Sequence, residues 1–176
     1  MQNPEIPVPV TVIGLGANLG DRQRTIELAI RAVAGLPGVE LVARSSLWQT
    51  APVGGPPQPD FYNAAVAVRS SLDPVSLMRH LLAIEQQFGR VRGAPNAPRT
   101  LDLDLLWIEG TALDSSPPAG PNVRVPHPRL RERAFALIPL LEVAPGATDP
   151  TSGILYALIL AEVGTEGVSP LDSSTA

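Results

Sequence analysis

Six short segments, in the order strand, helix, strand, strand, helix, strand, limit the folds open to this chain. Strands are predicted where apolar and β-branched residues cluster or alternate, and helices where apolar residues recur at spacings of three and four. The predicted strands cover residues 10–16, 39–48, 61–68 and 100–108, and the predicted helices follow the N-cap candidates Asp21 and Asp73. This order is typical of a ferredoxin-like βαββαβ sandwich of the α+β class.

The segments after residue 108 predict C-terminal helical additions to this frame. One helix is expected to start at Pro139, because proline inside a helix would break it, and a last helix is expected over residues 154–163. A length of 176 residues fits one domain with a sizeable core. We therefore expect a flexible arm over residues 1–9, a single domain over 10–163 and a disordered tail over 164–176.

Composition excludes several classes of function. The chain has no cysteine, which rules out a disulfide, a thiolate metal site and a cysteine nucleophile. All 13 basic residues are arginine, which rules out mechanisms that need a lysine. The formal charge of -4 argues against binding of nucleic acid over a broad surface. Neither a membrane span nor a signal peptide is recognisable, so no membrane partner and a cytoplasmic location are expected.

Asp102 and Asp104 form a candidate metal site. Residues two apart in a strand point to the same face, with Cα atoms about 6–7 Å apart. Carboxylate oxygens suit Mg²⁺, whose coordination is usually completed by water and substrate phosphates. The apolar residues expected on the opposite face of this strand are Leu101, Leu103, Leu105 and Trp107.

Three arginines precede the two aspartates: Arg90, Arg92 and Arg99. Their guanidinium groups could bind phosphate oxygens bidentately. A pair of aspartates in a strand is also typical of an ordinary solvated face, so a phosphate and Mg²⁺ site and a solvated strand remain comparable interpretations of the residues alone.

Other polar residues have both a functional and a structural interpretation. Phe61 and Asn63 share a face of their predicted strand and could bind a flat heterocycle, although a strand phenylalanine more often belongs to the core. Glu85 lies in the last turn of a predicted helix, where a negative charge is unfavourable with the helix dipole. It therefore either interacts with the nearby arginines or a ligand, or is a solvated surface residue. The spacing of Gly14, Gly16 and Gly20 departs from the dinucleotide-binding pattern, which favours glycines required by tight turns.

Several segments together resemble a known family, the 6-hydroxymethyl-7,8-dihydropterin pyrophosphokinases of folate biosynthesis. The similar segments are GLGANLGDR at 14–22, TAPVG at 50–54, QPDFYNAA at 58–65, GRVR at 89–92, PRTLDLDLL at 98–106 and VPHPRLRERAF at 125–135. The resemblance implies an ATP- and Mg²⁺-dependent diphosphotransferase. Its substrates would be ATP and 6-hydroxymethyl-7,8-dihydropterin, and the β,γ-pyrophosphoryl group would pass to the hydroxymethyl group to leave AMP.

The resemblance also implies roles for individual residues. Two Mg²⁺ ions would be held by Asp102 and Asp104, and Arg90 and Arg99 would complete the catalytic set by binding phosphate oxygens. The residues implied for ATP binding are Glu85, Arg92, His127 and Arg133. The residues implied for the pterin pocket are Thr50, Val53, Phe61, Asn63 and Phe135. Asn96 departs from the family pattern, within a loop over 93–98 that is expected to close over the substrates.

Two other functions are kept as alternatives. One is a non-catalytic, ferredoxin-like regulatory domain that binds a small ligand on its sheet. The other is a nucleotidyltransferase that uses the paired aspartates on nucleic acid, which the acidic composition disfavours. For the pyrophosphokinase, a monomer or a weak dimer is expected.

Overall fold

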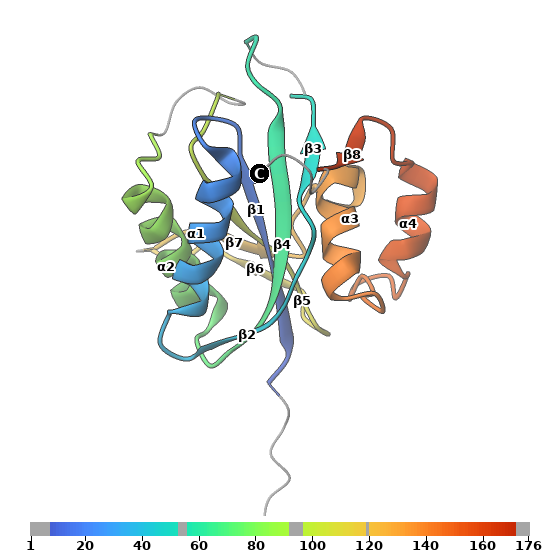
Figure 1. Cartoon of the computed structure of the whole chain (residues 1–176). Helices are drawn as coiled ribbons and strands as arrows, with labels where there is room; N and C mark the ends of the chain where they lie inside the picture. The colour runs from blue at the N-terminus through green and yellow to red at the C-terminus, as the bar shows by residue number, and fades with distance from the viewer. Residues whose placement is uncertain (1–7, 53–55, 92–96, 119, 172–176) are drawn as a thin grey trace, which may run out of the picture.

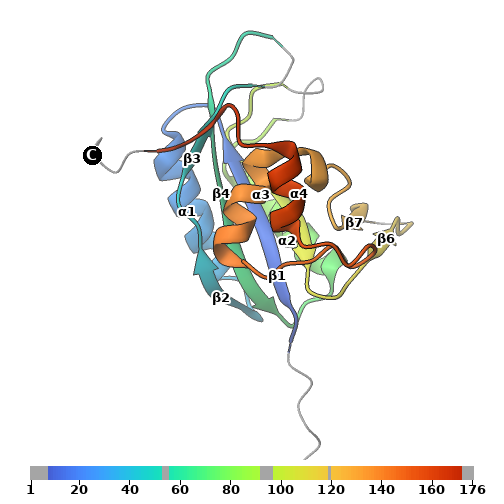
Figure 2. The ribbon, with the colours of Figure 1, turned by 90° about the vertical axis from the view of Figure 1, so that its right-hand side faces the viewer.

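A six-stranded antiparallel sheet lies between two layers of helices (Figure 1). The computed structural model describes residues 8–52, 56–91, 97–118 and 120–171. Helices α1 and α2 cover one face of the sheet, and α3 and α4 cover the other (Figures 1 and 2). The chain therefore has a mixed α and β fold with an antiparallel sheet and, within the described ranges, four α-helices.

The first seven elements follow the predicted order closely. They are β1 (Val10–Ala17), α1 (Arg22–Ala34), β2 (Val39–Arg44), β3 (Trp48–Thr50), β4 (Phe61–Ser70), α2 (Pro74–Gln87) and β5 (Asp102–Ile108). The remaining elements are β6 (Leu113–Ser115), β7 (Val123–Val125), a 3₁₀ turn (Leu130–Glu132), α3 (Ala134–Val143), α4 (Tyr156–Val163) and β8 (Val168–Pro170).

Aspartate side chains start both helices of the first layer. Asp21 accepts a hydrogen bond from the backbone N–H of Arg24 at 3.1 Å, and Asp73 accepts from the N–H groups of Val75 and Ser76 at 3.0 Å. These bonds satisfy N–H groups that have no partner within the helix, and they confirm both predicted N-caps. No helix within the described ranges is long and apolar enough to cross a membrane.

The strands lie in the order β5-β1-β4-β3-β8, with β2 also beside β4. The single strand predicted over 39–48 is therefore two strands, which pair with successive parts of β4. Between them, the N–H of Ser45 donates to the carbonyl of Ala65 and the hydroxyl of Ser45 accepts from the N–H of Ala65. A side chain thus replaces part of the ladder where the strand is interrupted.

Alternate residues of the central strand β1 face two separate apolar clusters. Ile13 and Leu15 pack in the cluster under α1 and α2, whereas Val12 packs in the cluster under α3 and α4. On this second face, Gly14 and Gly16 take the positions that follow Val12 at intervals of two residues. The face under α3 and α4 is therefore left without side chains from β1 beyond Val12.

One prediction about the faces of β5 is wrong. Leu101, Leu103 and Leu105 face the α1 and α2 cluster, as expected, but Trp107 belongs to the cluster on the other face. The pairing of β1 with β5 shifts between Val12 and Ile13, so β5 carries an extra residue there. Such a bulge interrupts the alternation of side chains, which turns Trp107 to the face of the two aspartates.

Two predictions about the C-terminal third are also corrected. Helix α3 starts at Ala134 and contains Pro139, because burial of Leu137 and Leu140 against the sheet outweighs the loss of one backbone hydrogen bond. The expected disorder after residue 163 is wrong for residues 164–171, since β8 forms there and pairs with β3. In the expected N-terminal arm, residues 8 and 9 are exposed, and residues 1–7 lie outside the described ranges.

Candidate active site

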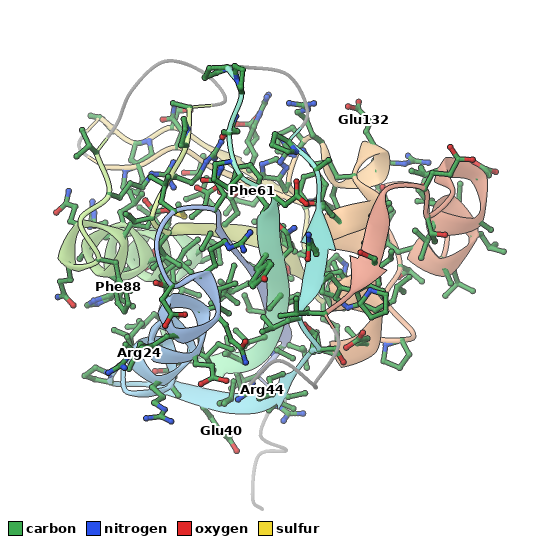
Figure 3. The ribbon with its side chains drawn as sticks, turned by 45° about the horizontal axis from the view of Figure 1, so that its top comes forward. Arg24, Glu40, Arg44, Phe61, Phe88 and Glu132 are labelled. Carbon is green, nitrogen blue, oxygen red and sulfur yellow. The ribbon has the colours of Figure 1, made fainter. Side chains whose placement is uncertain are left out.

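A cavity of about 570 Å³ opens on the face of the sheet that carries α3 and α4. Its wall includes parts of β1, β4 and β5, the residues after β3, the segment 129–136 and the segment 163–168. Figure 3 labels two of the lining residues, Phe61 at the start of β4 and Glu132 ahead of α3. Eight residues of the predicted site line this cavity: Thr50, Phe61, Asn63, Arg99, Asp102, Asp104, Arg133 and Phe135.

Two glycines of β1 form the floor of the cavity. Gly16 pairs with Asn63 on one side and Asp102 on the other, and Gly14 pairs with Asp104. A Cβ at Gly16 would lie 3.4 Å from Oδ1 of Asn63, and one at Gly14 would lie 3.0 Å from the side chain of Leu106. The interpretation of Gly14 and Gly16 as turn glycines is therefore wrong, because both lie within β1. Gly16 leaves space between Asn63 and Asp102, and Gly14 leaves room for the side chain of Leu106.

The two aspartates point into the cavity from β5. Burial raises the pKa of Asp104 to about 6, and the negative charge of Asp102 raises it further against the opposing charges of Arg133, Arg90 and Arg99. Among the described residues, no group of three or more His, Asp or Glu side chains is placed to hold a metal. The two carboxylates would therefore need water and ligand oxygens to complete the coordination of a hard cation.

Arg90 and Arg99 both pair with Asp102. Nη1 of Arg90 donates to Oδ1 of Asp102, and Nη1 of Arg99 donates to Oδ2 at 2.7 Å. The same Nη1 of Arg90 also donates to Oε1 of Glu85 at 2.8 Å and to the carbonyl of Leu101 at 3.1 Å. The arginines are thus held beside the carboxylates and add positive charge to this end of the cavity.

Glu85 is a buried member of this network. It is only 3% exposed, and its Oε1 accepts a hydrogen bond from the N–H of Leu103 at 2.7 Å. Burial raises the pKa of Glu85 to about 7, although the N–H of Leu103 and the charge of Arg90 act in the opposite direction. The solvated interpretation of Glu85 is therefore wrong. It does not line the cavity but holds Arg90 and the start of β5.

Aromatic rings line the cavity from two elements. Phe61 lies at the start of β4 and Phe135 in the first turn of α3. The guanidinium of Arg99 lies 5.5 Å from the ring centroid of Phe61, and that of Arg133 lies 5.6 Å from the centroid of Phe135. Each ring is thus close to a cation and open to the cavity, rather than enclosed in the core.

Asn63 is oriented by Thr50. Its Nδ2 donates to Oγ1 of Thr50 at 2.9 Å, and both residues are buried. This bond leaves Oδ1 of Asn63 directed over Gly16. A buried polar pair of this kind offers a ligand a fixed hydrogen-bonding edge.

His127 lies beside the charged end of the site, but it does not line the cavity. The backbone N–H of His127 donates to the carbonyl of Leu106 at 2.8 Å. The ring nitrogen Nδ1 accepts from the backbone N–H of Arg129 at 3.2 Å. Burial lowers the pKa of His127, and the nearby charge of Arg133 lowers it further. The neutral ring therefore carries its proton on Nε2, which is a hydrogen-bond donor. Three residues named in the sequence analysis, Val53, Arg92 and Asn96, lie outside the described residues.

Asn18 belongs to the site although its sequence position did not predict this. This residue is only 1% exposed, and its side chain accepts from the N–H of Arg99 at 2.8 Å. Its Nδ2 donates to Oε1 of Gln58 at 2.8 Å and to the carbonyl of Pro59 at 3.1 Å. Only the three-dimensional contacts reveal that Asn18 joins the arginine segment to the loop before Phe61.

Arg22 has a related role, which was not predicted from the sequence either. Nη1 of Arg22 donates to the carbonyl of Asp60 at 2.7 Å, and Nη2 donates to the hydroxyl of Tyr62 at 3.2 Å. The guanidinium lies 3.9 Å from the centroid of the Tyr62 ring. These contacts fix the residues on both sides of Phe61. The available signal was that Arg22 closes the segment GLGANLGDR.

Comparison with known proteins gives a consistent result. The family model for 7,8-dihydro-6-hydroxymethylpterin-pyrophosphokinase (HPPK) matches residues 12–145. The 2-amino-4-hydroxy-6-hydroxymethyldihydropteridine pyrophosphokinase of Synechocystis sp. is 41% identical over 160 residues, covering 91% of this chain and 79% of the relative. The protein of the same name from Pseudomonas aeruginosa is 39% identical over 159 residues, covering 90% of this chain and 94% of the relative.

Solved structures are similar in fold. The crystal structure of Plasmodium falciparum HPPK-DHPS with pterin and p-hydroxybenzoate superposes with a TM-score of 0.72 and covers 96% of this chain. The sequence identity is 13%, so this likeness supports the fold alone. The chain spans less than half of the length of that protein, 47%.

Proposed function

Since the chain belongs to the 7,8-dihydro-6-hydroxymethylpterin-pyrophosphokinase family, we propose that it transfers the β,γ-pyrophosphoryl group of ATP to the hydroxymethyl group of 6-hydroxymethyl-7,8-dihydropterin and releases AMP, in folate biosynthesis. The observation that carries the proposal is the cavity itself. It combines paired carboxylates, arginines and two aromatic rings on one face of the sheet. Charged groups for a polyphosphate and a flat apolar slot for a bicyclic ring are thus adjacent.

We propose that Asp102 and Asp104 hold Mg²⁺, with two ions as in the family resemblance. The donor set fits a hard cation, because both ligands are carboxylates on one face of β5 and both line the cavity. The pKa of Asp104 is raised first by burial and then by the negative charge of Asp102, and a cation bound to both carboxylates would offset this repulsion. Bound Mg²⁺ would neutralise charge on the phosphates of ATP.

The arginines would bind and orient the phosphates. Arg90 and Arg99 already lie against Asp102, so their guanidinium groups are within reach of any phosphate placed next to that carboxylate. Glu85 holds Arg90 in this position, and Arg133 adds a further cation on the cavity wall. In-line transfer depends chiefly on such positioning and on charge stabilisation.

The ATP-binding role of His127 and Arg92 remains a proposal. The neutral His127 ring could donate from Nε2 to a phosphate or ribose oxygen. Arg92 lies outside the described residues and is assigned from the family resemblance only.

The other half of the cavity fits the pterin. Phe61 and Phe135 would pack on the bicyclic ring, and Asn63, held by Thr50, would present Oδ1 to an N–H group of the pterin edge. Arg99 lies beside both Asp102 and Phe61, which brings the phosphate and pterin positions together. Val53 is assigned to this pocket from the resemblance only.

We also propose that the domain is ferredoxin-like, with β2 and β3 together in the place of the second strand of a βαββαβ unit. Helices α3 and α4 are the C-terminal additions. A cytoplasmic location and a monomer or weak dimer remain predictions.

The test is AMP release from ATP in the presence of Mg²⁺ and the dihydropterin. Asp102→Asn and Asp104→Asn should each lower kcat/KM by at least about 100-fold, because several kcal/mol of charge stabilisation depend on them and about 1.4 kcal/mol corresponds to a factor of ten. Asp114→Asn is the matched control, since Asp114 is an exposed aspartate that pairs only with Arg124 among the described residues.

Each alternative function predicts a different result. A regulatory domain would bind the pterin without releasing AMP, and unchanged turnover in both variants would exclude the metal role. Tight binding of an oligonucleotide at moderate salt, without pterin binding, would instead support the nucleotidyltransferase.

A further inference from the structure

We propose that the C-terminal segment Val163–Pro170 is part of the pterin pocket, with Val168 as a specificity-determining side chain on its outer wall and β8 as the support of Thr50. The proposal rests on the proposed function, because it assigns this part of the cavity to the pterin. It concerns residues outside the range 12–145 that the family model matches.

The first observation is that this segment lines the cavity. Val163, Gly164, Glu166, Gly167 and Val168 all contribute to the wall. They lie on the same side of the cavity as the residues after β3, because β8 pairs with β3. The aspartates of β5 lie at the opposite edge of the sheet. The segment is therefore next to the aromatic half of the cavity rather than the charged half.

The second observation is the pairing register. In antiparallel strands, residues directly opposite one another share a face of the sheet. Val168 is opposite Thr50, and Thr50 is opposite Phe61. Since Phe61 and Thr50 both line the cavity, Val168 extends the same row of side chains by one strand.

The third observation is that the segment is held at both ends. The N–H of Gly164 donates to the carbonyl of Leu160 at the end of α4, and the N–H of Leu171 donates to the carbonyl of Leu47 beside β3, both at 2.9 Å. In between, the N–H of Val168 donates to the carbonyl of Thr165 at 3.2 Å. The wall is thus fixed to two separate elements.

The position of Pro170 agrees with this pairing. Hydrogen-bonded pairs alternate along an antiparallel ladder, and the bond between Leu171 and Leu47 places Pro170 at a non-bonded position. Proline is tolerated there, because it has no N–H to donate. Ser169, opposite Gln49, is then at a bonded position where proline would remove a ladder bond.

The pairing of β3 with β8 supports the position of Thr50. Strand β3 has only three residues, and it lies between β4 and β8. Without β8 it would be a short edge strand, free to move away from β4. Because Thr50 orients Asn63, β8 would determine how firmly the polar edge of the pterin pocket is held.

The experiment measures the binding of 6-hydroxymethylpterin and, separately, of a non-hydrolysable ATP analogue with Mg²⁺, by calorimetry on the full chain. Val168→Ala should weaken pterin binding by about 3- to 15-fold, as expected for removal of two methyl groups that the bound ring would cover partly or fully. The Kd of the ATP analogue should change by less than about twofold, which is within the usual range for distant sites. Leu158→Ala is the control, because Leu158 is an apolar residue of α4 that is 58% exposed and does not line the cavity.

Ser169→Pro tests the supporting role, with Ser169→Ala as its partner. The proline variant should weaken pterin binding at least about tenfold, because one ladder bond is lost and its acceptor is left without a donor, whereas the alanine variant should bind like the wild type. Unchanged pterin binding in both Val168→Ala and Ser169→Pro would overturn the inference, and so would an equal loss of pterin and nucleotide binding. Failure of the wild-type chain to bind the pterin would instead refute the proposed function.

Discussion

Asn18 and Arg99 exchange two hydrogen bonds: the N–H of Arg99 donates to Oδ1 of Asn18 at 2.8 Å, and the N–H of Asn18 donates to the carbonyl of Arg99 at 3.1 Å. The side-chain nitrogen Nδ2 of Asn18 also donates hydrogen bonds to Oε1 of Gln58 and to the carbonyl of Pro59. One buried side chain therefore connects the arginine beside Asp102 with the loop that leads to Phe61.

Replacing Asn18 by alanine should impair both halves of the site. Three side-chain hydrogen bonds would be lost, and at about 1 kcal/mol each the free energy of unfolding should fall by roughly 2–4 kcal/mol. The KM values for ATP and for the pterin should both rise. Urea unfolding and steady-state kinetics measure these changes, and Asn122→Ala, at an exposed asparagine, should match the wild type. A rise in only one KM would show that Asn18 serves only that substrate.

Adding one methyl group to the cavity floor should weaken pterin binding and leave the stability of the fold nearly unchanged. A Cβ at Gly16 would make ordinary contacts, 3.4 Å from Asn63 and 3.9 Å from Asp102, so Gly16→Ala should fold with nearly unchanged stability. The methyl group would occupy ligand space, and pterin affinity should fall about 10- to 200-fold, the range for one methyl group in a tight pocket. Gly146→Ala is the control, because a Cβ there meets no atom within 4 Å. Unchanged pterin affinity in Gly16→Ala would place the ring elsewhere in the cavity.

Glu85 should make stability depend on pH. Its pKa is about 7 in the folded protein against an ordinary value of 4.5, so folding favours the protonated form. The stabilisation from this proton is complete below pH 4.5 and is lost as the pH rises through 7. The pKa of Glu85 already includes the effects of the charged groups that face it: Arg90 lowers it, and Asp102 and Asp104 raise it.

The measurement is the free energy of unfolding of wild type and Glu85→Gln, with a metal chelator present. Between pH 4.5 and about 8, the advantage of wild type over the variant should decrease by on the order of 3 kcal/mol. Glu40→Gln, at an exposed glutamate of β2 (Figure 3), should leave the pH profile unchanged. Parallel profiles for wild type and Glu85→Gln would contradict the assigned burial of this carboxyl.

Tyr156→Phe should stabilise the protein. The residue is 0% exposed, and its hydroxyl has no hydrogen-bond partner among the described residues. A buried hydroxyl without a partner costs roughly 1–3 kcal/mol, so its removal should raise the free energy of unfolding by about 1 kcal/mol. Tyr62→Phe is the contrasting variant and should be destabilising, since the hydroxyl of Tyr62 accepts from Arg22. A loss of stability in Tyr156→Phe would mean that its hydroxyl has a partner after all.

Local sequence signals predicted most of the elements. Asp21 and Asp73 marked the helix starts, and the alternation in β4 and the first part of β5 predicted their faces. The errors lie where tertiary contacts override local preference. Trp107 changed faces at a bulge, Pro139 was accommodated inside α3, and residues 164–171 gained their order from pairing with β3.

The candidate site was predicted unevenly for a similar reason. The carboxylates and aromatic residues stood out by their chemistry, and the cavity brings them together as expected. Asn18 and Val168 did not stand out, because an amide after a strand and a valine near the C-terminus acquire meaning only from residues far away in the chain. The functions of Gly14 and Gly16 were likewise invisible until their neighbours across the sheet were known.

The central place of β1 has a consequence for the order in which the sheet can be assembled. Among the elements that the structure describes, β1 comes first in the chain, yet its two neighbours, β4 and β5, begin at residues 61 and 102. Closing such long loops is slow compared with forming local contacts, so α1 can form well before β1 is paired. The pairing of β1 with both neighbours can therefore be completed only after synthesis has passed Ile108, the last residue of β5.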